Sequence, residues 1–194
     1  MKNLTLLLWL MVLISACSTE ELEERAKVEA YFDLEGTLDT VLEDLIVQNA
    51  RLEKKTVINE QTERVMLTLD SLMAWKLQLE VFYQSDINKV GLLNSYEIDT
   101  LQAFDGIQKV VYQTKKKSDF VKTMECSFRD GKLFVVRIIS SDENLVYKIN
   151  NELTLHFNHF KRKLALDHFS IQTKKEMIFK KQMDVQVEGE VVLP

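Results

Sequence analysis

Three histidines near the end of the chain have the clearest capacity for metal chemistry. His156, His159 and His168 follow an H-x2-H-x8-H spacing. Imidazole nitrogens are common zinc ligands, and a turn after His159 would let His156 and His168 face each other on neighbouring strands. No Cys, Asp or Glu converges at a fixed spacing, and Asp167 would face away from His168 in a regular strand. We therefore interpret the histidines as a surface cluster and expect no metal.

The two cysteines offer little redox chemistry. Cys126 alternates with Met124 and Phe128 on the apolar face of an expected strand, where a buried, inert thiol is more typical than a nucleophile. The other cysteine, Cys17, lies in an N-terminal signal described below. With Cys17 modified, no intramolecular disulfide can form.

Lysines cluster in four short segments. In a meander, successive turns alternate between the two ends of the sheet, so two of these clusters would share one end. Such a basic rim could meet lipid phosphates or an acidic partner. Lysines at turns and edges also keep sheets from associating edge to edge, which is the interpretation we favour. The clusters are 115–117, 161–163, 174–175 and 180–181, of which the first and third would share an end.

The sequence lacks the motifs of common enzyme classes. It contains no G-x-S-x-G elbow, no H-E-x-x-H helix, no phosphate loop and no G-x-G-x-x-G turn. No spacing singles out a pair of carboxylates suited to glycoside hydrolysis. We expect no enzymatic activity, no catalytic residues and no cofactor, since an enzyme would need polar groups that converge in a cleft.

Charge is unevenly distributed along the chain. The net charge of −5 combines Lys2 with 18 acidic and 8 basic residues in 17–100 and with 12 acidic and 16 basic residues in 101–194. A continuous Lys/Arg stripe is missing, so nucleic acid is not an expected partner.

The first residues have the pattern of an exported protein. Lys2 precedes an apolar run at 4–14, which is too short for a spanning helix of about 20 residues. Residues 14–17, Ile-Ser-Ala-Cys, resemble the lipobox of bacterial lipoproteins. This resemblance implies cleavage before Cys17 and acylation of its thiol and new amine, with a durable membrane anchor as the result. An ordinary secretory signal with a chance cysteine is the alternative.

Acidic residues follow the cysteine at 20–24. They resemble the surface-export signal of Bacteroidota lipoproteins, which implies an outer-membrane protein with its domain exposed at the cell surface. The first turn of a helix also favours acidic residues. With one proline, five glycines and no low-complexity linker, we divide the chain into a signal peptide (1–16), an acidic tether (17–24) and a single domain (25–194).

Two segments have helical periodicity. Apolar residues recur at spacings of three and four from Glu20 to about Ala50, and Gly36 predicts either a kink or a later helix start. Asp70-Ser71 offers an N-cap for a second helix that runs to Tyr83. The apolar stripe of the first helix is either a core face, which we favour, or a seam for a partner. It consists of Tyr31, Leu34, Leu38, Val41, Leu42, Leu45 and Ile46.

The rest of the chain predicts strands. Runs at 52–58 and 63–69 flank Asn59-Glu60-Gln61 as a hairpin. From Tyr96 on, seven strands follow as a meander. The fold class that we predict is α+β, with two amphipathic helices packed on one face of a curved antiparallel β-meander, or with the sheet rolled into a partial barrel. The predicted turns lie at Asp105-Gly106, Asp130-Gly131, 115–119, 141–144, 158–161 and 173–175.

Several short motifs resemble those of a family of small Bacteroidota lipoproteins, in which similar segments occur in the same order. The resemblance implies a lipid anchor, a helix-hairpin-helix front and a β-rich back, and it supplies no catalytic residues. The motifs are Tyr31-Phe32-Asp33-Leu34, Lys55-Thr56-Val57, the Trp75 helix with Glu80 and Phe82, the loop 85–89, and Ser95-Tyr96.

These observations support two functional hypotheses. The first is a lipid-anchored outer-membrane protein that acts as a non-enzymatic binding or accessory subunit in the cell envelope. The second is a carrier of lipid or another apolar ligand, with the curved sheet as a cup. A cavity lined by Phe, Met and Leu under the first helix would favour the carrier, and a filled core with an exposed apolar patch would favour the binding module.

Overall fold

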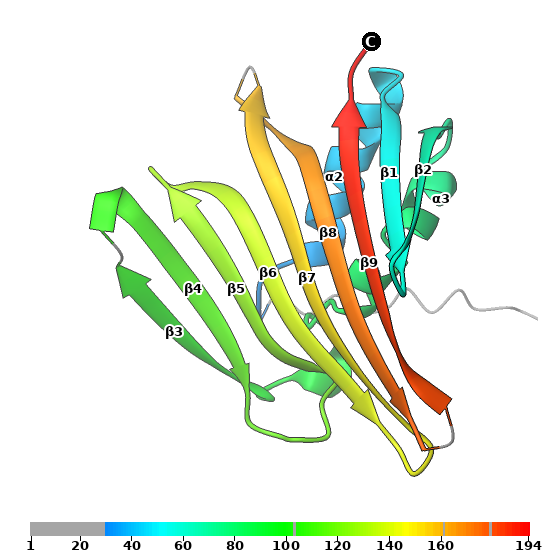
Figure 1. Cartoon of the computed structure of the whole chain (residues 1–194). Helices are drawn as coiled ribbons and strands as arrows, with labels where there is room; N and C mark the ends of the chain where they lie inside the picture. Colours follow the sequence, from blue (N-terminus) through cyan, green and yellow to red (C-terminus); the bar gives the residue numbers. More distant parts are fainter. Residues whose placement is uncertain (1–29, 103, 161, 179) are drawn as a thin grey trace, which may run out of the picture.

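The structure is a computed structural model that describes residues 30–102, 104–160, 162–178 and 180–194. Most of this part is one antiparallel sheet accompanied by a few short helices, so the predicted α+β class is confirmed. The sheet is open rather than closed (Figure 1). The signal peptide, Cys17 and the acidic tether lie outside the described residues. No helix in the described ranges is long and apolar enough to cross a membrane.

The sheet has nine strands in the order β2-β1-β9-β8-β7-β6-β5-β4-β3, so that β2 and β3 form its edges. All pairs are antiparallel. The strands are β1 Arg51–Ile58, β2 Gln61–Thr68, β3 Tyr96–Gln102, β4 Ile107–Thr114, β5 Val121–Arg129, β6 Lys132–Glu143, β7 Tyr147–Phe160, β8 Lys163–Met177 and β9 Lys180–Val192.

The predicted seven-strand meander is confirmed as β3 to β9. One of its hairpin signals acts as expected: Asp130 and Gly131 both have positive φ, at 51° and 71°, between the paired residues Arg129 and Lys132. This is the backbone that a two-residue turn between twisted strands requires. Asn59 and Glu60 form the β1–β2 turn in the same way.

Two features of the sheet differ from the prediction. The β1–β2 hairpin is not a separate front, because β1 pairs with β9 and extends the meander; Leu52 lies opposite Val191. The turn predicted at 173–175 is also wrong, because β8 continues to Met177. The polar Thr173 keeps the strand alternation, and its Oγ1 donates to Asn151 Oδ1 of β7 at 2.8 Å.

The first described helix is α2 (Leu34–Val47), and its late start is one of the two outcomes that Gly36 predicted. Residues 30–33 are not helical, because Asp33 acts as the N-cap and its Oδ1 accepts a hydrogen bond from Gly36 N at 2.9 Å. Gly36 therefore lies in the first turn, where it produces no kink. The earlier part of the predicted helix lies outside the described residues.

The second predicted helix is divided in two. Ser71 caps α3 (Leu72–Gln78) as expected, with its Oγ accepting from Ala74 N at 3.3 Å. The backbone of Leu79 leaves the helical region, with φ −112° and ψ 14°, and α4 (Glu80–Gln84) begins after it. Trp75 of α3 and Phe82 of α4 both reach the core, where each is fully buried.

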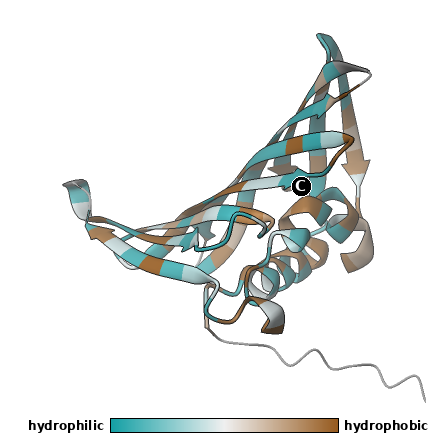
Figure 2. Ribbon diagram, turned by 90° about the horizontal axis from the view of Figure 1, so that it is seen from below, coloured by the Kyte–Doolittle hydropathy of each residue, from teal (hydrophilic) through white to brown (hydrophobic). Residues whose placement is uncertain are grey.

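The core lies between the helices and the concave face of the curved sheet, as Figure 2 shows. The side chains of Leu34, Leu38, Leu42 and Leu45 on α2 are almost completely buried. They share this core with residues that alternate along β5 to β8, namely Met124, Cys126, Val136, Ile138, Leu153, Leu155, Leu166 and Phe169. The space directly beneath α2 is therefore filled.

A buried polar loop fixes the chain just before α2. The side chain of Asn88 accepts hydrogen bonds from the backbone amides of Ala30 and Tyr31, at 3.1 and 3.3 Å. Asp86 is only 4% exposed, and burial raises the pKa of its carboxyl above the usual range. This loop corresponds to the predicted polar segment 85–89, which turns out to be structural.

Candidate functional site

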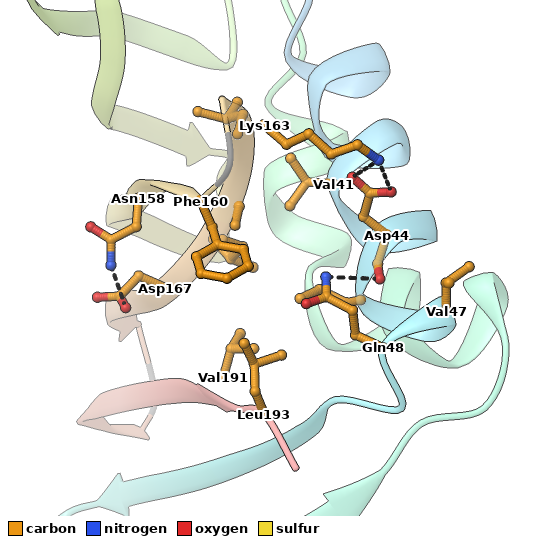
Figure 3. Close-up of a pocket in the computed structure, with 14 residues that line it drawn as sticks. Val41, Asp44, Val47, Gln48, Asn158, Phe160, Lys163, Asp167, Val191 and Leu193 are labelled. Atoms are coloured by element: carbon orange, nitrogen blue, oxygen red, sulfur yellow. Dashed lines mark hydrogen bonds and ion pairs between the residues drawn. The ribbon is translucent and has the colours of Figure 1, made fainter.

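An apolar groove lies between the C-terminal half of α2 and the ends of β7, β8 and β9 (Figure 3). Its volume is about 520 Å³, which falls within the range of small-molecule sites. Val41 and Leu45 of α2 form one wall, and Leu164 and Leu166 of β8 form the other. Val191 contributes to the floor.

The walls follow from helical and strand periodicity. Val41 and Leu45 are four residues apart, so they lie on the same face of α2. Leu164 and Leu166 alternate along β8 and so face the same side of the sheet. Val41, Leu45 and Leu166 are almost completely buried, whereas Leu164 is only partly buried.

The rim of the groove is polar on both sides. Lys163 Nζ lies 2.9 Å from Asp44 Oδ1, which joins the start of β8 to α2. On the sheet side, Asn158 Nδ2 donates to Asp167 Oδ1 at 2.7 Å. Partly exposed ion pairs contribute little to stability, so the Asp44–Lys163 pair matters mainly because it spans the opening.

Three exposed apolar side chains surround the opening. Val47 is 79% exposed, Phe160 is 60% exposed and Leu193 is 51% exposed. Figure 3 shows the Phe160 ring pointing toward α2, with Leu193 below it. Single exposed apolar residues are ordinary, but a group beside an apolar groove is typical of a binding surface.

The groove continues along α2 on the other side of the ion pair. A second hollow of about 540 Å³ is lined by Gly36, Thr37 and Thr40 of α2. It shares Val41, Asp44, Lys163 and Leu164 with the first hollow. Together they form an elongated surface, which we call the α2 groove, beside a helix that is about 21 Å long.

The histidines do not belong to this groove. The rings of His156 and His168 are stacked with their centroids 4.0 Å apart, so the prediction that they face each other is confirmed. They lie on the other face of the sheet from Leu155 and Phe169. His159 does not join them, because its Nε2 contacts the carbonyl oxygen of Leu133 at 2.9 Å.

The prediction that Asp167 faces away from His168 is wrong. Asp167 Oδ2 lies 2.7 Å from His168 Nδ1. The pairing of β7 with β8 shifts register at this point, from His156 opposite His168 to Phe157 opposite Leu166, which leaves Asp167 as the extra residue of a bulge. The bulge lets two consecutive residues approach each other.

The surroundings of His156 disfavour its protonated form. Burial lowers the pKa of His156, and His168 and Arg137 lower it further, while Asp167 acts in the opposite direction. Among the residues that the structure describes, no group of three His, Cys, Asp or Glu side chains could hold a metal ion.

Cys126 is buried in the core as expected. Burial and the neighbouring Glu125 raise the pKa of its thiol to about 12. The thiolate is the reactive form of cysteine, so this side chain is unreactive in the folded protein.

Two of the lysine clusters, 115–117 and 174–175, share one end of the sheet as predicted. The β4–β5 connection, which carries 115–117, and the last residues of β8, which include 174–175, lie at one end of the sheet. Lys163 lies at the other end, at the start of β8. Among the lysines of these clusters that the structure describes, only Lys163 contributes to the α2 groove.

Comparison with protein-family models and with curated proteins found no match to this chain. The assignment of function therefore depends on the sequence signals and on the geometry of the site.

Sequence reasoning did not find the α2 groove. The assignment of the α2 stripe to the core is confirmed for Leu34, Leu38, Val41, Leu42 and Leu45. The 161–163 cluster was assigned to a turn, without a role in a groove. The missing information was the position of the β7–β8 turn relative to α2. The one available signal was Phe160, an aromatic residue directly before a basic turn.

Proposed function

We propose that this protein is a lipoprotein of the bacterial outer membrane, anchored through acyl chains on Cys17, that acts without catalysis as a binding or accessory subunit in the cell envelope. The lipobox-like residues 14–17 and the acidic tether support this location, with the domain facing the cell surface. The protein would be a member of the small Bacteroidota lipoprotein family that its motifs resemble. In that interpretation, the described helices α2, α3 and α4 and the β1–β2 hairpin correspond to the helix-hairpin-helix front.

The observation that carries the functional proposal is the elongated shape of the α2 groove. Its two hollows share four lining residues and follow one helix. An extended apolar segment of an envelope protein fits such a surface, with its backbone crossing near the Asp44–Lys163 pair. The filled core beneath α2 also favours a surface binding site over an internal cavity.

A carrier of an apolar ligand is the second candidate. The first hollow is large enough for a small ligand and is lined mainly by aliphatic side chains. A carrier would use this hollow alone, whereas a partner segment would extend into the second hollow beside Thr40.

In-cell cross-linking tests the proposal. A photoreactive benzoylphenylalanine replaces Phe160 in the full-length chain, and irradiated cells are analysed for adducts. We expect a defined envelope protein attached at position 160. The control places the same group at Met73, which is 68% exposed on α3 and lines neither hollow.

A second substitution separates the two candidates. Thr40→Trp would fill the second hollow, and Glu35→Trp is the control on an exposed site of α2 outside the groove. We expect Thr40→Trp alone to reduce the protein adduct. Lipid adducts that persist in Thr40→Trp would establish the carrier instead, and equal adducts at positions 160 and 73 would contradict both candidates.

A further inference from the structure

One end of the sheet combines exposed lysines with exposed apolar turns. The β4–β5, β6–β7 and β8–β9 connections all lie there, at the lower end in Figure 1, and we call this the basic end. Its segments 113–122, 142–148 and 174–184 contain nine lysines and five acidic residues. This gives a local net charge of +4 in a chain whose net charge is −5.

The apolar side chains lie at the tips of two hairpins. Leu145 is 91% exposed, Val146 is 60% exposed and Ile178 is 65% exposed. The backbone amide of Ile178 donates to the carbonyl oxygen of Val146 at 3.2 Å, so the two tips are joined. The three side chains therefore form one projecting group, which we call the apolar tips.

These tips contribute nothing to the core. The core ends along β6 to β8 at a polar row in which Asn151 donates to Ser140 Oγ at 3.1 Å and accepts from Thr173. Beyond this row the hairpins continue for several residues without helices above them (Figure 1). Burial in the folded chain therefore does not explain the apolar tips.

The lysines beside the tips are held outward. Lys115, Lys116 and Lys117 are exposed, and none of them forms an ion pair with another described residue. Lys122 Nζ donates to the carbonyl oxygens of Lys117 and Asp119, which fixes the loop that carries them. Lys175 lies over the Tyr147 ring at the base of the tips.

We propose that the basic end docks on a lipid bilayer with anionic headgroups. The apolar tips would enter the interface, and the lysines would contact headgroup phosphates, which is the combination that holds peripheral proteins on anionic membranes. The shape favours a bilayer over an acidic protein. Three side chains on projecting turns cannot supply the buried core of a protein interface, and the hollow beside them, between 113–122 and 141–150, is polar.

This docking adds a second contact to the one that we propose at Cys17, and it uses different residues. An extended chain from Cys17 to Ala30 reaches at most about 45 Å, which sets the largest separation between an anchor at Cys17 and the start of the described domain. The inference does not depend on what the α2 groove binds.

Fluorescent labelling at the tip tests the proposal with the full-length protein. Leu145→Cys is labelled with a polarity-sensitive thiol probe, and the protein is added to vesicles of phosphatidylcholine with or without phosphatidylglycerol. Cys126 is buried, and the parent chain labelled in parallel corrects for any reaction at Cys17. We expect a blue shift and quenching by nitroxide lipids only on the anionic vesicles, and a loss of both at high salt.

Two further variants decide the outcome. The same probe at Met73→Cys, on α3, should show no shift. A triple variant changes only exposed side chains of the β4–β5 loop, and it should abolish the blue shift of the probe at position 145. Its substitutions are Lys115→Glu, Lys116→Glu and Lys117→Glu. A tip that stays in a polar environment on anionic vesicles, or a shift that is equal on neutral vesicles, would overturn the proposal. If the probe at position 145 stays in a polar environment, and an acidic protein binds to the parent chain but not to the triple lysine variant, the basic end would be a site for that protein instead.

Discussion

The environment of His156 shows how neighbours set the properties of one residue. Its ring stacks on His168 and is partly removed from water, so that its pKa is lower in the folded chain than its ordinary value of 6.5. Asp167 opposes this effect only in part. A lowered pKa means that the unfolded chain takes up the proton more readily than the folded chain.

The stability of the protein should therefore decrease as the pH falls below about 6.5, through the range between the unfolded and folded pKa values of His156. We expect the free energy of unfolding, measured with urea, to decrease less between pH 7.5 and pH 5.5 in His156→Asn than in the wild type. Met73→Ala, at an exposed position without a titratable group, is the control, and it should keep the wild-type dependence. Identical pH dependence in wild type and His156→Asn would contradict this assignment.

Residue types and their spacing predicted some of these side-chain environments but not others. The spacing of His156 and His168 predicted their approach across a turn, and Cys126 was correctly placed in the core. The contact between Asp167 and His168 was not predictable, because it depends on a bulge that no residue type marks. The exposure of Phe160 was equally hidden, since a strand face becomes open or covered only when α2 is in position.

At the scale of elements, the packing of β8 on β9 depends on one glycine. Phe169 points into the core, where its ring meets that of Phe82 edge to face with centroids 6.0 Å apart. A Cβ atom at Gly189, its partner on β9, would overlap the Phe169 ring. Glycine here allows a close approach between a strand and an aromatic side chain.

Gly189→Ala should lower the free energy of unfolding by about 1 to 3 kcal/mol, because the ring held by Phe82 would have to move. A smaller residue at position 169 would remove the overlap. The cost of Gly189→Ala should therefore be smaller in a Phe169→Leu background, as measured by urea unfolding in a double-mutant cycle. Equal costs in both backgrounds would show that the ring does not constrain position 189.

Elements that depend on local sequence signals were predicted well. Turn signals placed the hairpins at Asn59-Glu60 and Asp130-Gly131, and Ser71 marked a helix start. Long-range pairing was not predictable: nothing in β1 indicates that it lies beside β9, more than 120 residues later. The turn expected at 173–175 failed because polar residues can continue a strand where the core has ended.

At the scale of the whole molecule, the two proposed contacts lie at opposite ends. The α2 groove is next to Phe160 and Lys163, where β7 ends and β8 begins, and the basic end is next to Met177. The 15 residues of β8 separate them by about 50 Å. With the basic end on a membrane, the groove faces away from it and is accessible to a partner.

Both proposed roles, membrane docking by the basic end and partner binding by the α2 groove, require a protein that is held at a membrane. The acylation of Cys17 is therefore the central claim. Mass spectrometry of the N-terminal peptide of the protein, purified from the envelope of its native cells, tests it directly. We expect a chain that begins at Cys17 and carries acyl groups on the thiol and on the amine. An N-terminus elsewhere, or an unmodified Cys17 in a protein recovered from the soluble fraction, would contradict the account.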